Sequence, residues 1–432
     1  MRGWRRLSLG PETQGSTLGI GTTTLLLLAA LTPLGFLAYR LGRGKALGAM
    51  AAGISMHSRP QQYGWYSVVW MGLPALGVAL AAALLSVFGL ISPSRELVLI
   101  VSLAVALMGL AHGLRAIRPE VRARNVLDNV IRLLLLSAAL ISIITTVAIV
   151  LSIVFEAMRF FREVSVWEFV TGTVWSPGDT FLEAAGRGDE VGEGTSFFGS
   201  VPLFAGTFMV TAIAMATALP IGLLSAIFMS EYATRAQRGI AKPVLEILAG
   251  IPTVVYGFFA AITVTPIIVD IATFFGLDAS YSNILSPGIV MGIMIIPFIS
   301  SLSDDVINSI PQSLREGAYA LGTTHSETIK KVILPAALPG VISAFLLGVS
   351  RALGETMIVV MAAGVRPNLT WNPLEDMTTV TVSIVYSLTG DLAFDSPQTL
   401  SAFALGLVLF IVTLSLNLVS TYLVRRFKQN YD

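Results

Sequence analysis

Apolar segments of about 20 residues recur along the whole chain, with polar segments between them. We predict nine spans, near residues 18–39, 65–91, 96–116, 133–155, 201–229, 244–269, 287–303, 339–363 and 399–424. A helix needs about 20 apolar residues to cross a hydrocarbon layer of about 30 Å, whereas the strands of a membrane barrel alternate over about ten residues. The pattern therefore predicts an all-α, polytopic helical membrane protein.

Composition supports the membrane interpretation and excludes several kinds of site. Of the 432 residues, 54% are hydrophobic and 12% are charged, whereas a soluble domain carries roughly 25% charged residues. A net charge of +1 gives no indication of nucleic-acid binding, and the absence of cysteine excludes disulfides, thiolate metal sites and cysteine nucleophiles. The three histidines, His57, His112 and His325, lack the spacing of metal ligands.

Lysine and arginine are concentrated in alternate loops, which predicts the orientation of the chain. Cationic side chains near membrane spans favour the cytoplasmic face, and the loops rich in them are 40–64, 115–132, 230–243, 305–338 and the C-terminal end. This distribution predicts a cytoplasmic C-terminus, and nine spans then place the N-terminus outside. Arg2, Arg5 and Arg6 oppose that last assignment, because they would lie outside as well.

The polar segment between the seventh and eighth spans has the local signals of two short helices. Pro311 suits the first turn of a helix, and Gly322 suits the left-handed position that ends one. Thr324 and Glu327 predict a capping box at the start of a second helix, which Pro335 is then expected to end. The segment is therefore predicted to be a helix–glycine–helix element on the membrane surface.

This segment resembles the EAA loop of ABC importer permeases, whose pattern is E-A-A, three residues, G, nine residues and I-x-L-P. The matching residues are Glu316, Ala318, Gly322, Leu334 and Pro335. Gly317 stands where alanine is usual, and Val332 where isoleucine is usual. Because the loop binds a cleft of the ATPase subunit in that family, the resemblance implies an ATPase-coupling role for Glu316, Gly317, Ala318, Gly322, Leu334 and Pro335. The alternative is an ordinary amphipathic loop.

Three other stretches resemble the permease pair of the phosphate-specific (Pst) importers, PstC and PstA. They are residues 204–208, 245–257 and 350–364, and the run Gly354-Glu-Thr-Met357 is PstC-like rather than PstA-like. The resemblance implies a type I importer (MetI-like) core of six spans at 125–432, with its coupling loop at 305–338. Residues 1–124 then form an N-terminal extension with about three transmembrane helices.

A charged pair in the eighth span is the main candidate for contact with a transported ion. Arg351 and Glu355 are four residues apart, so a continuous helix would place them on one face, where they can pair. Charged residues within the membrane are costly and usually face a cavity or a partner, and arginine matches the geometry of phosphate oxygens. The alternative is an ion pair that packs this helix against the sister permease.

The sixth span is expected to line the same path. Gly250, Pro252 and Gly257 interrupt its backbone, which is tolerated only beside a cavity or a protein partner. Hydroxyl groups that could contact the transported ion belong to Thr207, Thr211, Thr253, Tyr256 and Thr356. Such groups also connect helices to one another. Glu246, at the start of this span, is expected to accept a hydrogen bond from a basic loop residue, and the alternative is a role in transport.

The long loop 156–200 carries many acidic residues, with Trp167, Phe169 and Trp175 among them. One interpretation is a solvated loop with a glycine-rich tip at 186–194 and aromatic residues at the membrane interface. The other is a docking surface for an external binding protein. The sequence leaves both open.

The chain lacks the motif G-x-x-x-x-G-K-[ST], so ATP must be bound by another chain. The resemblance implies a non-catalytic permease of the bacterial inner membrane, without a cofactor of its own, that imports inorganic phosphate. Its implied partners are a PstA-like permease, a PstB-like ATPase dimer that binds ATP and Mg²⁺, a PstS-like periplasmic binding protein and the lipid bilayer. The alternatives are a permease for molybdate or sulfate, an ion-coupled secondary transporter, and a phosphate-sensing scaffold.

Overall fold

The computed structural model describes residues 11–87, 89–91, 93–177, 198–390 and 396–428. The chain divides into two compact units, the first ending at Thr146 and the second beginning at Val147. The predicted boundary after residue 124 lies near the start of a long helix, Ala123–Glu163, which continues from the first unit into the second. The acidic part of the loop 156–200, from 178 to 197, lies outside the described residues.

Four helices build the first unit: α1 (Pro11–Ala51), α2 (Pro60–Val87), α3 (Arg95–Ala116) and the first part of α4 (Ala123–Glu163). Helices α1, α2 and α3 bury Leu27, Ala38, Met71, Ala75 and Ala106 between them. Gly109 lets α3 approach α2 closely, because a Cβ atom there would lie 2.1 Å from the Trp70 carbonyl oxygen.

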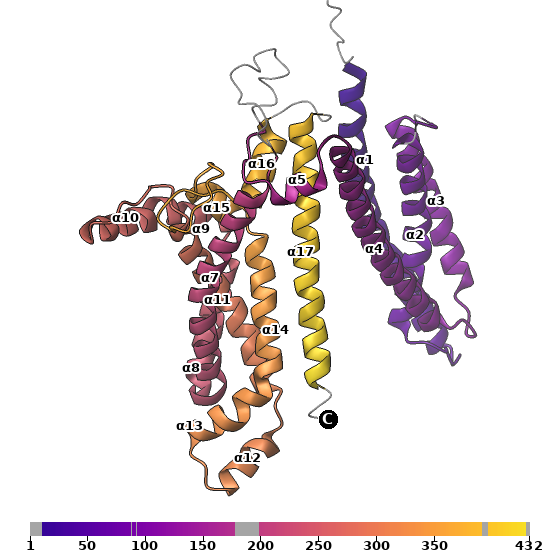
Figure 1. Ribbon diagram of the computed structural model, residues 1–432. Helices are drawn as coiled ribbons and strands as arrows, with labels where there is room; N and C mark the ends of the chain where they lie inside the picture. Colours follow the sequence, from indigo (N-terminus) through magenta and orange to yellow (C-terminus); the bar gives the residue numbers. More distant parts are fainter. Residues whose placement is uncertain (1–10, 88, 92, 178–197, 391–395, 429–432) are drawn as a thin grey trace, which may run out of the picture. The chain divides into compact units, whose positions relative to one another are not determined.

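The second unit is also built of helices (Figure 1), joined by irregular segments whose described residues contain two isolated β-bridges, Trp175 with Phe198 and Asn283 with Asp376. Its elements are α5 (Val166–Thr171), α7 (Val201–Ile227), η2 (Phe228–Tyr232), α8 (Arg235–Gly250), α9 (Thr253–Phe259), η3 (Ala260–Val264), α10 (Thr265–Phe274), α11 (Leu285–Asn308), α12 (Gln312–Ala320), α13 (His325–Thr328), η4 (Ile329–Ile333), α14 (Leu334–Leu353), α15 (Met357–Ala362), α16 (Val380–Gly390) and α17 (Pro397–Lys428). The η elements are single π-helical turns that continue the helices beside them.

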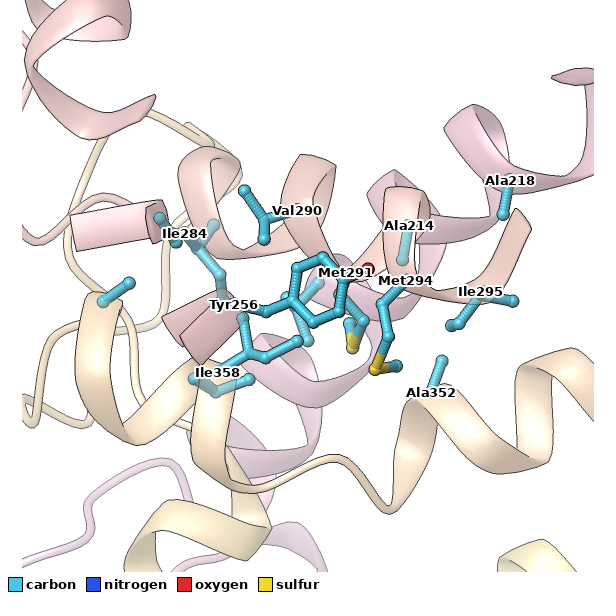
Figure 2. Close-up of a cluster of buried hydrophobic side chains, with 14 of the residues drawn as sticks. Ala214, Ala218, Tyr256, Ile284, Val290, Met291, Met294, Ile295, Ala352 and Ile358 are labelled. Carbon is cyan, nitrogen blue, oxygen red and sulfur yellow. The ribbon is translucent and has the colours of Figure 1, made fainter. Parts of the chain in front are cut away.

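The centre of the second unit is the contact between α7 and α11. Met291, Met294 and Ile295 on α11 pack against Ala214 and Ala218 on α7, and Tyr256 of α9 adjoins them (Figure 2). Other described helices present large apolar side chains outward, as expected where lipid rather than water surrounds them.

The aromatic residues that follow α4 lie in a second core. Phe169 and Trp175 are buried and meet Phe160 and Phe198 edge to face, with ring centroids 5.2–6.3 Å apart. Packing within the protein therefore buries Phe169 and Trp175, so these two residues do not belong to an exposed aromatic patch. Trp167 remains 76% exposed.

Nine described helical segments are long and apolar enough to cross a membrane, which confirms the nine predicted spans. Several boundaries differ: the first span ends at Ala51 rather than near 39, the fourth is longer at Ala123–Glu163, and the eighth begins at His325 rather than near 339.

Two further differences reflect breaks in a helix. The sixth span begins at Thr253 rather than near residue 244, because Pro252 has an extended backbone (ψ 137°) that separates α8 from α9. The eighth ends at Leu353 rather than at 363, because residues 354–356 separate α14 from α15.

Candidate functional site

The predicted coupling loop at residues 305–338, called the coupling segment from here on, has the predicted local structure in its first half. Pro311 directly precedes α12, and Gly322 has the left-handed φ of +81° that ends this helix. Thr324 and Glu327 form the capping box: the Thr324 N–H donates to Glu327 Oε2 over 3.1 Å, and the Glu327 N–H donates to Thr324 Oγ1 over 3.3 Å. These signals are local, which is why the sequence alone predicts them.

The prediction that Pro335 ends the second helix is wrong. Helix α13 continues through η4 into α14 and runs from His325 to Leu353. Pro335 lies in the first turn of α14, directly after the wider π turn. That turn accommodates a proline ring that would clash with the preceding turn of a regular helix. As a result, the coupling segment is directly continuous with a membrane span.

Part of the coupling segment faces away from the spans and is unpaired. Leu321 is 87% exposed, and Glu316 is exposed without a hydrogen-bond or ion-pair partner among the described residues. Tyr319 and Leu314 are also exposed, whereas Ala318 is buried. An exposed mixture of apolar side chains and one carboxylate is typical of a surface that a second protein covers.

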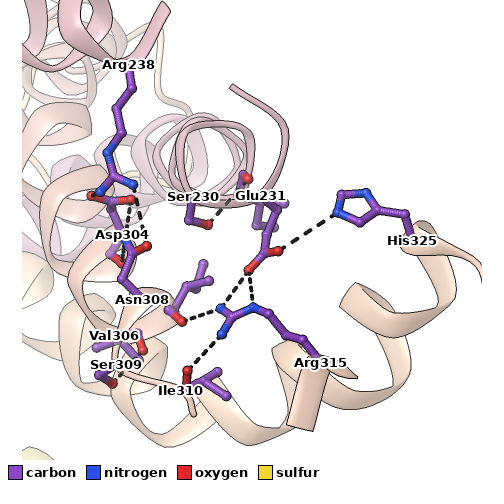
Figure 3. A network of polar contacts seen from close by, with 12 residues as sticks. Ser230, Glu231, Arg238, Asp304, Val306, Asn308, Ser309, Ile310, Arg315 and His325 are labelled. Atoms are coloured by element: carbon purple, nitrogen blue, oxygen red, sulfur yellow. Dashed lines mark hydrogen bonds and ion pairs between the residues drawn. The ribbon is translucent and has the colours of Figure 1, made fainter. Parts of the chain in front are cut away.

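The opposite side of α12 is held to the spans by one buried ion pair, shown in Figure 3. Arg315 donates from Nη2 to Glu231 Oε1 over 2.8 Å and from Nε to the same oxygen over 3.2 Å. The two side chains are 12% and 7% exposed. Arg315 also donates to the carbonyl oxygens of Ile307 and Ile310, over 2.9 and 2.8 Å. One guanidinium group thus connects α12, the end of α11 and η2.

His325 extends this connection to the second half of the segment. Its Nε2 lies 4.0 Å from Glu231 Oε2, and its ring packs edge-on against Tyr232 at 4.8 Å between centroids. The Tyr319 ring stacks on the His325 ring, with 6.4 Å between the two centroids. Glu231 therefore receives contacts from both halves of the coupling segment.

A second buried carboxylate connects α8 to α11. Asp304 is 1% exposed and accepts a hydrogen bond from Arg238 Nη2 over 2.7 Å. The Asn308 side-chain amide donates to Asp304 Oδ1 over 2.8 Å, and Lys242 Nζ lies 4.0 Å from the carboxylate. The expectation that Glu246 accepts from a basic loop residue is not met, since Glu246 is exposed and Asp304 receives the α8 cations instead.

Sequence reasoning missed Glu231 and Asp304. Both are acids at the ends of apolar spans, where a charge is costly unless it is paired. The cost of an unpaired charge at these positions therefore indicates that each acid has a partner. Their partners were not predictable, because Arg315 is 84 positions from Glu231 and Arg238 is 66 positions from Asp304.

The predicted pairing of Arg351 with Glu355 is wrong. Helix α14 ends at Leu353, so the two residues do not share a helix face. Glu355 Oε1 instead accepts from the Met357 N–H over 3.1 Å, at the start of α15. Arg351 lies over the Phe298 ring, 5.7 Å from its centroid, and has no ion pair among the described residues.

Arg351 lines a cavity of about 260 Å³ within the second unit. The other charged residues around it are Lys242, Glu246 and Asp304. Asp304 is already paired with Arg238. Arg351 is therefore a cation in this cavity that has no ion-pair partner among the described residues. An arginine side chain of this kind can bind an anion.

Several of the predicted hydroxyl groups form hydrogen bonds within the protein. Thr207 is buried, donates to the Leu203 carbonyl and accepts from the Val380 N–H, so its hydroxyl is used within the protein. Tyr256 donates to the Leu248 carbonyl over 2.9 Å and thereby bridges the break between α8 and α9. Thr253 and Thr356 are half-buried beside the helix breaks at 251–252 and 354–356. No cluster of potential metal ligands occurs among the described residues.

Comparison with known families finds two matches on this chain. Residues 218–429, which include the coupling segment and Arg351, match the family described as "Binding-protein-dependent transport system inner membrane component". Residues 25–96 match the family described as "Phosphate ATP-binding cassette transporter". The first match lies in the second unit and the second match in the first unit.

Several curated proteins are similar over most of their length. The probable ABC transporter permease protein YqgH of Bacillus subtilis is 34% identical, over 69% of this chain and 91% of that protein. The phosphate transport system permease protein PstC 1 of Mycobacterium tuberculosis is 33% identical, over 63% and 86%. The phosphate transport system permease protein PstC of Xylella fastidiosa is 31% identical, over 69% and 91%.

Proposed function

This chain belongs to the family of ABC transporter permeases, the inner membrane components of binding-protein-dependent transport systems, and we propose from that premise that it imports inorganic phosphate. The observation that supports phosphate is the similarity to PstC permeases over most of their length. The match of residues 25–96 to a phosphate transporter family supports the same substrate independently. The chain is a membrane subunit with several spans.

The proposed complex contains the partners that an ABC importer needs. A PstB-like ATPase dimer binds ATP and Mg²⁺, so this chain itself is non-catalytic and holds no cofactor. A PstA-like permease forms the other half of the path, and a PstS-like periplasmic protein delivers phosphate. The chain lies in a bacterial inner membrane, with the coupling segment and the C-terminus in the cytoplasm, as the distribution of cations favours.

Coupling to the ATPase is proposed to use the exposed side of α12. Leu321 and Glu316 would enter a cleft of the ATPase, since both side chains are exposed in this chain, and Tyr319, which is 41% exposed, would lie at the edge of that contact. Movement of α12 would be transmitted inward by Arg315, because its guanidinium group contacts both α11 and η2. The continuity of α13, η4 and α14 gives a second, covalent connection to a span.

The proposed contact with phosphate is Arg351. An anion inside a membrane is as costly as any buried charge unless a cation accompanies it. Arg351 lines a cavity in the second unit, and Phe298 supports its guanidinium group without neutralising it. Glu355 has a different role in this proposal: its carboxylate caps α15 and fixes the break beside Arg351.

The direct test is uptake of labelled phosphate in a deletion strain that carries this chain with its partner subunits. Restored phosphate uptake, with no uptake of labelled molybdate or sulfate, is the expected result. Uptake of either other oxyanion in place of phosphate would overturn the substrate while leaving the permease assignment intact. Full uptake of phosphate without any ATPase subunit would contradict coupling and favour a secondary transporter.

A further inference from the structure

The first unit carries a concentration of positive charge at one end. The connection from α1 to α2 and the connection from α3 to α4 both lie there, since the helices alternate in direction. The cations in and beside these two connections are Arg43, Lys45, Arg59, Arg115, Arg118, Arg122 and Arg124, and the acids are Glu120 and Asp128. The proposed transport function uses none of them.

Two of these cations meet at one cavity. Arg59 precedes α2 and Arg124 lies in the first turn of α4, and together with His57, Ser58 and Gln62 they line a cavity of about 530 Å³. The two arginines are 65 positions apart in the sequence, so the fold itself brings them together. The lining contains no acidic side chain.

The walls of this cavity are held by hydrogen bonds. The His57 N–H donates to the Pro119 carbonyl over 3.2 Å, which joins the two connections. The Arg124 N–H donates to Ser58 Oγ over 3.4 Å, and the Arg59 N–H donates to Gln62 Oε1 over 3.0 Å. These bonds use backbone N–H groups, and neither guanidinium group donates a hydrogen bond among the described residues.

A packed apolar layer supports the cavity. Tyr63 is fully buried one turn into α2, and its hydroxyl donates to the Val121 carbonyl over 2.8 Å. It packs in a cluster with Ala46, Tyr66, Ile117 and Ala123. Because these residues come from α1, α2, the start of α4 and the residue that follows α3, the positions of Arg59 and Arg124 are fixed by the core of the unit.

Only one of the two guanidinium groups has an ion-pair partner among the described residues, and that pair is exposed. Arg59 has no side-chain partner among the described residues, and Arg124 lies 3.6 Å from Asp128, a pair whose side chains are 70% and 63% exposed. An exposed pair of this kind is worth little in water. The cavity therefore presents two planar donor groups that suit the oxygens of a phosphate group.

The surroundings of the cavity indicate where that phosphate group comes from. Trp65 is 56% exposed on α2, one turn beyond Gln62, and packs edge-on against Tyr39 at 5.4 Å between centroids. Exposed tryptophan and tyrosine are enriched at the level of lipid headgroups. Farther along α2, Leu73, Leu76 and Leu80 are exposed, as side chains facing acyl chains are.

We propose that this cavity binds the headgroup phosphate of an anionic phospholipid, with Arg59 and Arg124 as its ligands. Basic pockets between transmembrane helices bind such headgroups in the same way. The exposed apolar side of α2 would lie along the acyl chains, which inorganic phosphate lacks. Binding would fix the first unit in an anionic leaflet.

Native mass spectrometry of the assembled complex, released from nanodiscs, tests the proposal. The nanodiscs contain phosphatidylethanolamine with either phosphatidylglycerol or phosphatidylcholine, and the retained lipids are counted. The double variant R59Q/R124Q should lose retained phosphatidylglycerol by about tenfold or more, since each cation near an anionic lipid contributes appreciably. The matched control, R118Q/R122Q, removes the same charge from exposed positions outside the cavity and should retain the lipid.

Equal loss in both double variants would show a diffuse charge effect and overturn the site. Retention of phosphatidylcholine as strong as that of phosphatidylglycerol would do the same. Equilibrium dialysis of the lipid-free protein in detergent with radiolabelled inorganic phosphate distinguishes the two sources of phosphate. If the protein binds inorganic phosphate and R59Q/R124Q abolishes that binding, the ligand of this cavity is free phosphate rather than a lipid headgroup.

A measurement on the unaltered protein covers the case in which R59Q/R124Q fails to assemble. Phosphatidylglycerol with a photoactivatable headgroup should crosslink to peptides containing residues 57–62 or 122–126. Crosslinks confined to other segments would contradict the proposal.

Discussion

Arg315 and Glu231 form a buried ion pair between the coupling segment and the end of the fifth span. The two groups are 2.8 Å apart, and both side chains are at most 12% exposed. Buried ion pairs contribute little net stability, but removal of one partner leaves an uncompensated charge. This asymmetry makes the pair suited to hold α12 in one orientation, because any other orientation separates the charges.

Replacement of Arg315 should therefore separate α12 from the spans. For Arg315→Gln we expect a loss of about 3–5 kcal/mol in stability, and weak phosphate uptake even where the complex assembles. Thermal stability of the purified complex in detergent and uptake in the deletion strain measure the two effects. Lys330→Gln is the matched control, since Lys330 is exposed and has no partner among the described residues. Wild-type stability and uptake in Arg315→Gln would refute the proposed role of the pair.

The two glycines of the coupling segment should respond in opposite directions to alanine. An added Cβ at Gly317 meets nothing within 4 Å in the middle of α12, so Gly317→Ala should stabilise this helix by about 0.5–1 kcal/mol. Gly322 also has open space but a φ of +81°, so Gly322→Ala should cost about 1–2 kcal/mol. Melting temperatures of the two variants test the contrast. Equal shifts would show that backbone conformation at Gly322 is not the reason for the glycine.

Glu316 should matter for ATPase binding and not for folding. Because its carboxylate is exposed and unpaired among the described residues, Glu316→Lys should leave the melting temperature unchanged. It should weaken co-purification of the ATPase subunit and reduce uptake. Asp305→Lys makes the same charge change at an exposed position on α11 and serves as the control. If both variants retain the ATPase equally well, Glu316 lies outside the interface.

The coupling segment shows which features a sequence can predict. The capping box of Thr324 and the left-handed Gly322 depend on neighbours within a few residues, and both predictions are confirmed. The nine spans depend on local hydropathy and are confirmed too. The prediction that Pro335 ends a helix is wrong, because the π turn directly before Pro335 removes the usual clash.

Features that depend on distant residues were not predictable. The pairing of Arg351 with Glu355 assumed a continuous helix, whereas the backbone turns at Gly354 and Glu355 caps α15. The contact of Thr381 Oγ1 with the Glu355 carbonyl, over 2.9 Å, helps to hold this break. Partners of this kind lie far along the chain and leave no periodic pattern near the residue that they position.

Orientation can be tested in a chain that has no cysteine of its own. A membrane-impermeant thiol reagent added to intact cells should label Asp189→Cys and should not label Arg122→Cys or Lys330→Cys. Permeabilised cells should show labelling at all three positions, which controls for buried thiols. Labelling of Lys330→Cys in intact cells would reverse the orientation and with it the coupling proposal.

The structure changes the expected effect of substitutions at Arg351 and Glu355. Since Arg351 and Glu355 do not pair, the exchange of Arg351→Glu with Glu355→Arg has no ion pair to restore, and we expect it to be inactive. Arg351→Gln should abolish phosphate uptake while the complex assembles normally, because Arg351 is exposed to the cavity and its removal leaves no buried charge alone.

The conservative variants separate charge from position. Arg351→Lys keeps the cation and should retain part of the uptake, though weakened, because lysine cannot donate in the planar arrangement of arginine. Glu355→Gln keeps an oxygen that can accept from the Met357 N–H, so it should lower uptake less than Arg351→Gln does. Labelled phosphate uptake per assembled complex is the measurement for all four variants. Robust uptake by a well-assembled Arg351→Gln variant would remove Arg351 from the path and leave its contact with Phe298 as a packing interaction.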